Sequence, residues 1–187
     1  ITGFSKSSET RAKASKLKLC EVFDKVEEAV HGADLIILCV PVGAMASVVT
    51  AISNFVKPGA IITDVGSVKS EVINQLVTLI PSDAFFVPAH PLAGTEHSGP
   101  EAGFESLFDN RWCIITPTEN SPRQAVDLVV SFWQSIGAEV EIMTPKHHDL
   151  VLAVTSHVPH LIAYTMVGVA DDLANVTKSE VINYSAA

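Results

Sequence analysis

Two uninterrupted apolar runs, separated by one helical stretch, constrain the fold of this chain more than any other feature. The first run spans residues 35–40, and the second begins a predicted strand at 60–64 that ends in Thr63 and Asp64; neither run alternates apolar with polar side chains. Such runs are typical of strands that are covered on both faces, as in parallel sheets. The stretch between them starts at Pro41, which suits the first residue of a helix, and carries apolar residues at helical spacing: Met45, Val48, Val49, Ile52 and Val56. A strand, a helix and a strand in this order require parallel strands.

The alternation of strands and helices continues on both sides of this unit. A strand at 1–4 and helices at 9–17 and 24–31 precede it, and a helix at 68–77 and a strand at 85–87 follow. This order predicts an α/β fold with a doubly wound, Rossmann-like and mostly parallel sheet.

The pattern changes in the second half of the chain. Strands are predicted at 112–116 and 139–143, with a helix at 122–136 between them, and only helical pattern remains after that. We therefore place a domain boundary near residue 144. The prediction is a nucleotide-binding domain at 1–144 and the beginning of an all-helical substrate and dimerisation domain at 145–187.

Composition favours a cytoplasmic protein that acts on a small molecule. The net charge is −9 and no block of basic residues occurs, which argues against nucleic-acid and membrane-surface partners. The three cysteines lie far apart in apolar contexts, which indicates buried, reduced thiols. The apolar run at 150–170 is interrupted by serine, histidine and proline, so it predicts a buried helix and not a membrane span.

Residues 89–99 carry the strongest candidate for catalysis. His90 is predicted at or just past the end of a strand, where open α/β sheets place reactive groups. Its imidazole can exchange a proton near neutral pH, and Thr95 and Glu96 add a hydroxyl and a carboxylate. Ser67, after the strand at 60–64, either caps the next helix or points its hydroxyl into the crevice.

A nucleotide site is predicted at the carboxyl ends of the first strands. The chain contains no G-x-G-x-x-G turn, so we expect a fold that lacks its first strand and glycine-rich loop. Ser5 then stands where an NAD enzyme carries an acid, and Lys6 with Ser7 and Arg11 could receive the 2′-phosphate of NADP. NAD remains possible as the cofactor. The alternative without a ligand is a capped loop at 5–8 and a plain strand-to-helix junction at 40–41. The candidate cofactor contacts are Ser5, Lys6, Ser7, Val40 and Pro41.

Histidines in the predicted helical part could be metal ligands or hydrogen-bonded residues of a domain interface. His157 and His160 are three residues apart and would share one face of a helix. Together with the cluster at 147–149 they could in principle hold a metal. Pro159 and the apolar surroundings favour histidines that are hydrogen-bonded in a domain interface and line a substrate pocket, so we predict no metal.

Four motifs, in their order and spacing, resemble the prephenate/arogenate (cyclohexadienyl) dehydrogenase family of tyrosine biosynthesis. They are Asp64-x-Gly66-Ser67-x-Lys69, the stretch at 90–99, His148-Asp149 and Ser156-His157-x-Pro159-His160. The resemblance implies an enzyme that oxidatively decarboxylates prephenate or arogenate. A hydride leaves the hydroxyl-bearing ring carbon for NAD(P)⁺, the ring carboxylate departs as CO₂, and the ring becomes aromatic.

The resemblance also implies roles for single residues. His90 would take the proton of the ring hydroxyl, and Ser67 would help to hold that hydroxyl and His90. The remaining substrate contacts would edge the pocket: Thr95, Glu96, His157 and His160. The family's dimer interface and carboxylate-binding arginine are expected beyond this chain, which implies a homodimer for the full-length protein and little activity for these 187 residues alone.

Two other functions remain open on the sequence. The first is another NADP-dependent two-domain dehydrogenase, of the β-hydroxyacid type, which would rely on a lysine in the helical domain. Lys146 and Lys178 are the lysines there, and neither lies beside a pocket motif. The second is a non-catalytic ligand-binding relative, although it would not need to retain His90 and Ser67 together. The sequence leaves open the choice between prephenate and arogenate.

Overall fold

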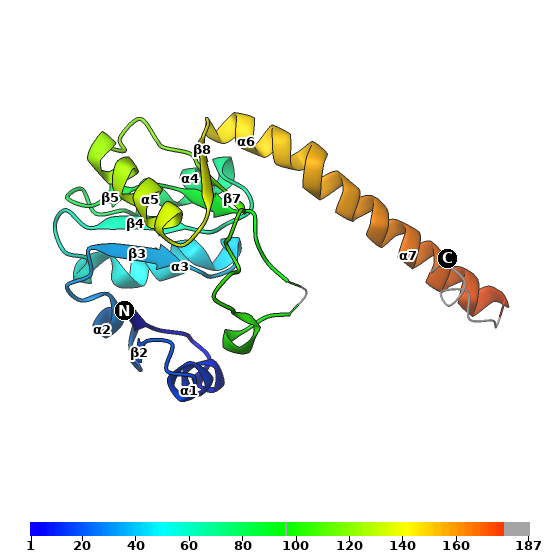
Figure 1. Cartoon of the computed structure of the whole chain (residues 1–187), viewed down its shortest axis with the longest axis horizontal. Coiled ribbons are helices and arrows are strands. Elements are labelled where there is room, and N and C mark those ends of the chain that lie inside the picture. The colour runs from blue at the N-terminus through cyan, green and yellow to red at the C-terminus, as the bar shows by residue number, and fades with distance from the viewer. Residues whose placement is uncertain (96, 178–187) are drawn as a thin grey trace. The chain divides into compact units, whose positions relative to one another are not determined.

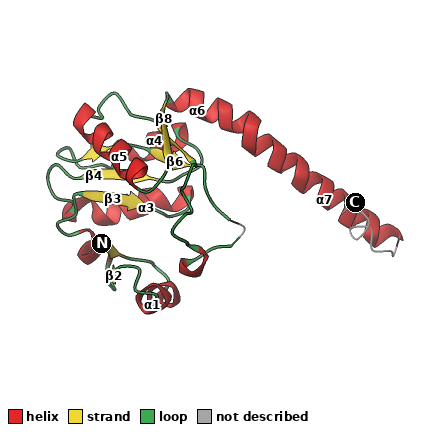
Figure 2. Ribbon diagram, in the orientation of Figure 1, coloured by secondary structure: helices red, strands yellow, loops and turns green. Residues whose placement is uncertain are grey.

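The computed structural model divides the chain into two compact units, Ile1–His148 and Asp149–Ala187 (Figure 1). The structure describes residues 1–95 and 97–177. Strands β1 to β8 belong to the first unit, and the described part of the second unit is helical (Figure 2).

The N-terminal part forms a small parallel pair of strands with two helices. Its elements are β1 (Thr2–Gly3), α1 (Ser8–Lys16), β2 (Glu21–Val22) and α2 (Val26–Val30). The Ser7 hydroxyl accepts the N–H of Thr10 at 3.2 Å and so caps α1. Gly32 follows α2 at φ +73°, a backbone conformation that glycine adopts readily, and ends the helix.

The central sheet confirms the predicted strand-helix-strand unit. Its strands are all parallel, in the order β3 (Leu35–Leu38), β4 (Ile61–Asp64) and β5 (Phe85–Phe86). The connections are α3 (Val42–Ile52), with a 3-10 turn at Ser53–Phe55, and α4 (Ser70–Leu76).

Layers of helices cover both faces of this sheet, which explains the uninterrupted apolar runs. Ile62 belongs to the buried cluster that contains residues of α3 and α4, whereas its neighbour Ile61 belongs to the cluster that contains residues of α5 (Arg123–Ser135). Successive side chains of a strand point to opposite faces, so both faces of β4 are buried. Each buried isoleucine contributes about 2 kcal/mol through the removal of apolar surface from water.

Two predicted helix starts are corrected. Pro41 is not the first residue of α3 but precedes it, and its carbonyl accepts the N–H of Ala44 at 2.8 Å. Ser67 does not cap the following helix, because α4 begins three residues later, with Lys69 at the N-cap position. The turn after β4 is therefore longer than the sequence pattern indicates.

The strand that carries His90 also differs from the prediction. His90 is the middle residue of a separate strand, β6 (Ala89–Pro91), which pairs antiparallel with β7 (Trp112–Ile115); β7 pairs parallel with β8 (Glu139–Ile142). Pro88 explains the break, because it has no N–H to continue the ladder with β4. Its carbonyl accepts the N–H of Thr116 at 2.9 Å, so the chain changes its neighbour from β4 to β7 at this residue.

The helical part consists of α6 (Pro145–Leu152), a π-helical turn (Ala153–His157) and α7 (Val158–Thr177). Pro159 accounts for the π turn, since its ring would clash with the carbonyl four residues earlier in a regular helix. By length and composition alone, the helix at Pro145–Leu173 could cross a membrane, with a mean hydropathy of 1.5. A core helix of a soluble protein passes the same test.

The prediction that this apolar helix is buried is wrong for the residues that the structure describes. Leu161 is 66% exposed, Tyr164 77% and Met166 68%. An apolar helix face becomes buried only where another segment packs on it, and the sequence pattern does not say which segment that is.

Candidate active site

A pair of imidazoles forms the centre of the candidate site. His90 in β6 is 9% exposed, and its Nδ1 lies 2.9 Å from Nε2 of His148, which is fully buried. The ring centroids are 5.1 Å apart and the ring planes are inclined by 64°. His148 lies near the start of α6, where its N–H donates to the carbonyl of Thr144 at 3.0 Å. The sequence names both histidines but gives no sign that they meet.

A buried ion pair lies next to these imidazoles. Asp64 ends β4 and Lys69 precedes α4, and both side chains are fully buried. Lys69 Nζ donates to Asp64 Oδ2 at 2.5 Å and to the carbonyl of Ala89 at 2.8 Å. Ala89 is the neighbour of His90, so the ion pair ties the turn at 65–69 to the strand that presents the imidazole.

The turn at 65–69 is built closely around Asp64. The N–H of Gly66 donates to Asp64 Oδ2 at 2.8 Å. A Cβ at Gly66 would lie 2.9 Å from that same oxygen and 3.2 Å from the Met45 Cε, so a side chain does not fit. Burial raises the pKa of Asp64, and the Lys69 ammonium and the Gly66 N–H limit that rise. The turn thus depends on a charge pair that is costly to bury and costly to break.

The structure brings some predicted site residues together and leaves others apart. Ser67 is exposed in the turn that Lys69 joins to the His90 strand. Thr95 is also exposed, and its hydroxyl accepts the N–H of His97 at 3.2 Å. Glu96 lies outside the described residues. His157 in the π turn and His160 in α7 belong to the second unit.

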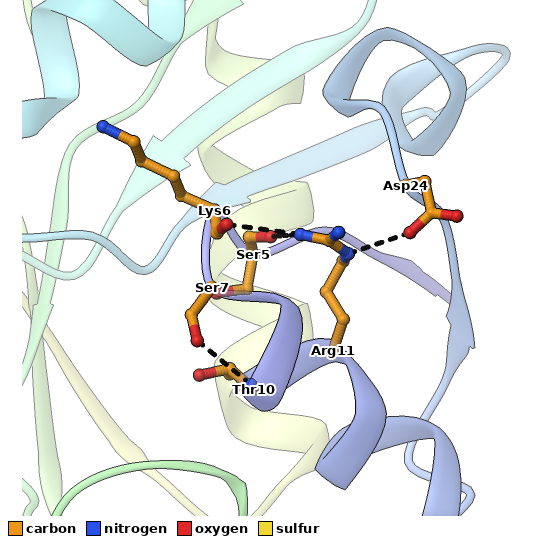
Figure 3. A network of polar contacts seen from close by, with 6 residues as sticks. All are labelled: Ser5, Lys6, Ser7, Thr10, Arg11 and Asp24. Carbon is orange, nitrogen blue, oxygen red and sulfur yellow. Dashed lines mark hydrogen bonds and ion pairs between the residues drawn. The ribbon is translucent and has the colours of Figure 1, made fainter.

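The predicted cofactor loop is shaped by Arg11 (Figure 3). Arg11 Nη1 donates to the carbonyls of Ser5 at 2.7 Å and Lys6 at 3.3 Å, and Nε donates to Asp24 Oδ1 at 3.1 Å. Figure 3 shows the Lys6 side chain extending away from the Arg11 guanidinium. Arg11 therefore holds the loop between β1 and α1, while Lys6 and the Ser7 cap lie on the exposed side.

The second predicted cofactor segment follows β3. Val40 is half-buried and packs against the hydrophobic cluster of the central sheet, whereas Pro41 is exposed. Both lie at the carboxyl end of a parallel strand, the edge where open α/β sheets bind ligands. Among the described residues, no three or more His, Cys, Asp or Glu side chains come together to hold a metal.

Cys113 in β7 gives the stability of this region a dependence on alkaline pH. All three cysteines are free, but only Cys113 is buried; Cys20 is half-buried and Cys39 exposed, which corrects the prediction for those two. Burial raises the pKa of Cys113 from 9.0 to about 12, against an opposing backbone hydrogen bond from His90. The folded state therefore keeps a proton that the unfolded chain loses above pH 9.0.

We expect stability to fall as pH rises through this range. The contribution of the buried thiol is fully present below pH 9.0 and is lost as pH approaches about 12, at up to ~1.4 kcal/mol per pH unit. In urea unfolding, Cys113→Ala should lose ~1 kcal/mol less than wild type between about pH 9 and about pH 10, because the unfolded thiol is only partly ionised at the start of this interval. Cys20→Ala is the matched control. An identical pH dependence for Cys113→Ala and wild type would contradict this account.

Two family models match this chain. Residues 1–142 match the nucleotide-binding domain of prephenate dehydrogenase, and residues 144–187 match its dimerization domain. A curated relative, the cyclohexadienyl dehydrogenase of Zymomonas mobilis, is 42% identical over 187 residues, which are 100% of this chain and 64% of the relative.

Two solved structures are similar along most of the chain. Prephenate dehydrogenase from Aquifex aeolicus, in complex with hydroxyphenyl propionate and NAD⁺, has a TM-score of 0.84 at 31% identity, over 92% of this chain and 60% of that one. Arogenate dehydrogenase from Synechocystis has a TM-score of 0.77 at 25% identity, over 95% of this chain and 64% of that one. The chain thus spans somewhat less than two thirds of the length of each of these three relatives. With two consecutive family models covering it almost from end to end, the chain belongs to the prephenate dehydrogenase family.

Proposed function

We propose that this protein oxidatively decarboxylates prephenate or arogenate, with transfer of a hydride to NAD(P)⁺, as a step in tyrosine biosynthesis. The observation that carries the proposal is the imidazole of His90, paired with His148 and joined through Ala89 to a buried ion pair. The Aquifex aeolicus relative, crystallised with hydroxyphenyl propionate and NAD⁺, supports the class of substrate and cofactor. An imidazole held in this way suits proton removal from a hydroxyl during hydride transfer.

The proposed roles of the residues follow from the chemistry of the reaction. The nicotinamide, when bound, accepts the hydride from the hydroxyl-bearing ring carbon. His90 accepts the proton of the hydroxyl, and Ser67 holds the same hydroxyl by a hydrogen bond. Aromatisation drives the loss of CO₂, so the protein mainly has to orient the ring and stabilise charge at the hydroxyl. We propose four further residues as substrate contacts: Thr95, Glu96, His157 and His160.

The proposed domains follow the family match. Residues 1–144 form the nucleotide-binding domain and residues 145–187 belong to a helical domain for substrate binding and dimerisation. The match of 144–187 to a dimerization domain favours a second copy, and not a membrane, as the cover of the exposed apolar side chains of α7. We therefore propose a cytoplasmic homodimer.

We propose NADP as the preferred cofactor, with Ser5, Lys6, Ser7, Val40 and Pro41 as its contacts. The loop after β1 carries no acid at 5–7, so it does not repel a 2′-phosphate. Arg11 donates a hydrogen bond to the Ser5 carbonyl of this loop, and Ser7 caps the start of α1. Anions are favoured at such a start.

We expect Lys6→Gln to weaken the binding of NADP⁺ about fivefold, or ~1 kcal/mol, because one exposed charge partner of the 2′-phosphate is lost. NAD⁺ binding should stay unchanged, since NAD⁺ lacks that phosphate. Calorimetric titration of both cofactors measures the difference, with Lys16→Gln at the end of α1 as control. Equal weakening for both cofactors, or tighter wild-type binding of NAD⁺ than of NADP⁺, would argue against the assignment.

The proposed activity is tested with full-length protein and every pairing of two substrates with two cofactors. Prephenate and arogenate are each mixed with NAD⁺ or NADP⁺, a β-hydroxyacid is assayed in parallel, and the absorbance of the reduced cofactor is followed. Reduction with at least one pairing supports the function. Reduction with a β-hydroxyacid alone would favour the other two-domain dehydrogenase, and cofactor binding without any reduction would favour a non-catalytic relative.

A further inference from the structure

The contact between His90 and His148 requires one hydrogen between two ring nitrogens. Nδ1 of His90 and Nε2 of His148 are 2.9 Å apart, so one nitrogen donates an N–H and the other accepts it. We propose that His148 is the acceptor, and that it thereby holds His90 in the tautomer whose hydrogen is on Nδ1. The inference deepens the proposed function and rests on it for the role of His90 as a base.

The other arrangements of hydrogens do not suit a base in this position. Two charged imidazoles would point two N–H groups at each other and place two positive charges in a buried site. If His148 donated, the hydrogen of neutral His90 would be on Nε2, and that nitrogen could not take a proton from a hydroxyl. When His90 donates from Nδ1, its Nε2 carries the lone pair that a base needs.

The proposed arrangement also suits the state after proton transfer. Once Nε2 of His90 has taken a proton, the ring is an imidazolium and still donates from Nδ1 to His148. The contact therefore needs no rearrangement and becomes a charge-assisted hydrogen bond. This is the way in which the third member of a catalytic triad holds its histidine, with a neutral imidazole in place of a carboxylate.

The surroundings of His148 fit an acceptor of fixed orientation. Its side chain is fully buried, which disfavours the charged form. Its backbone is fixed at the start of α6 by the bond to the Thr144 carbonyl. His148 acts through His90, so it is a positioning residue.

The tautomer of His90 can be measured directly in the full-length protein. In protein labelled with ¹⁵N-histidine, long-range ¹H–¹⁵N spectra distinguish a ring protonated on Nδ1 from one protonated on Nε2. Wild type should show His90 with its hydrogen on Nδ1. His148→Asn, whose side-chain oxygen can accept, should keep that tautomer, whereas His148→Leu should lose it. Hydrogen on Nε2 in wild type would overturn the proposal even if no variant folds, and so would an unchanged tautomer in His148→Leu.

Steady-state kinetics of the full-length protein give the second test. His148→Leu should lower kcat about tenfold or more with little change in the KM values, and His148→Asn should recover part of that loss. An unchanged kcat in His148→Leu would also overturn the proposal. If wild type reduces no cofactor with either substrate, the proposed function fails, while the spectra still decide whether His148 sets the tautomer.

Discussion

Replacement of His90 by asparagine is expected to slow the chemical step by ~10²-fold or more while cofactor binding is retained. Asparagine is polar and can still hydrogen-bond to His148, but it cannot take a proton from the substrate hydroxyl. The loss should therefore appear in kcat and in single-turnover rates of cofactor reduction. The dissociation constant of the cofactor, measured without substrate, should stay close to that of wild type.

His31→Asn is the matched control for this prediction. His31 is exposed at the end of α2 and is not among the residues assigned to the candidate site, so its replacement should leave kcat unchanged. A His90→Asn variant that keeps more than about a tenth of the wild-type single-turnover rate would show that another group removes the proton.

Replacement of Lys69 by methionine is expected to lower the free energy of unfolding by ~3–5 kcal/mol. Methionine keeps much of the length of the side chain but leaves the buried Asp64 carboxylate without its cation. It also removes the donor to the Ala89 carbonyl, so the His90 strand should lose its register as well. Urea unfolding near neutral pH measures the change.

A surface lysine and a double variant provide the controls for Lys69. Lys57 pairs with Asp34 at the surface, where its side chain is 39% exposed, so Lys57→Met should cost at most ~1 kcal/mol. Lys69→Met combined with Asp64→Asn should be more stable than Lys69→Met alone, because the uncompensated buried charge is gone. Equal losses for Lys69→Met and Lys57→Met would contradict the account of the buried pair.

The central sheet could be predicted because its residues are constrained on both faces. The runs at 35–40 and 60–62 are apolar throughout, and a strand covered on both faces explains that pattern. The separate strand β6 could not be predicted in the same way. Pro88 shows in the sequence that the ladder must break, but only the fold shows that β7, more than twenty residues later, becomes the new neighbour.

The sequence indicates which residues are candidates for the site, but it does not indicate which of their side chains are in contact. The sequence offers His90 and Ser67 as candidates but gives Lys69 no role, although lysines are almost never fully buried without a partner. A local signal existed, since Asp64 closes an apolar strand and must be compensated if that strand end is buried. The contact between His90 and His148 spans 58 residues and leaves no local signal at all. The exposure of the apolar α7 helix was missed for a related reason, because helical periodicity does not identify the segment that packs on it.

The proposed reaction is tested most directly by following the hydrogen of the hydroxyl-bearing ring carbon. Full-length protein is given prephenate or arogenate with deuterium at that carbon, together with NADP⁺ or NAD⁺, and the reduced cofactor is examined by mass spectrometry. The account predicts that the deuterium appears in the reduced cofactor, with one CO₂ released for each cofactor reduced. Release of CO₂ without reduction, or a reduced cofactor that carries no deuterium, would contradict it.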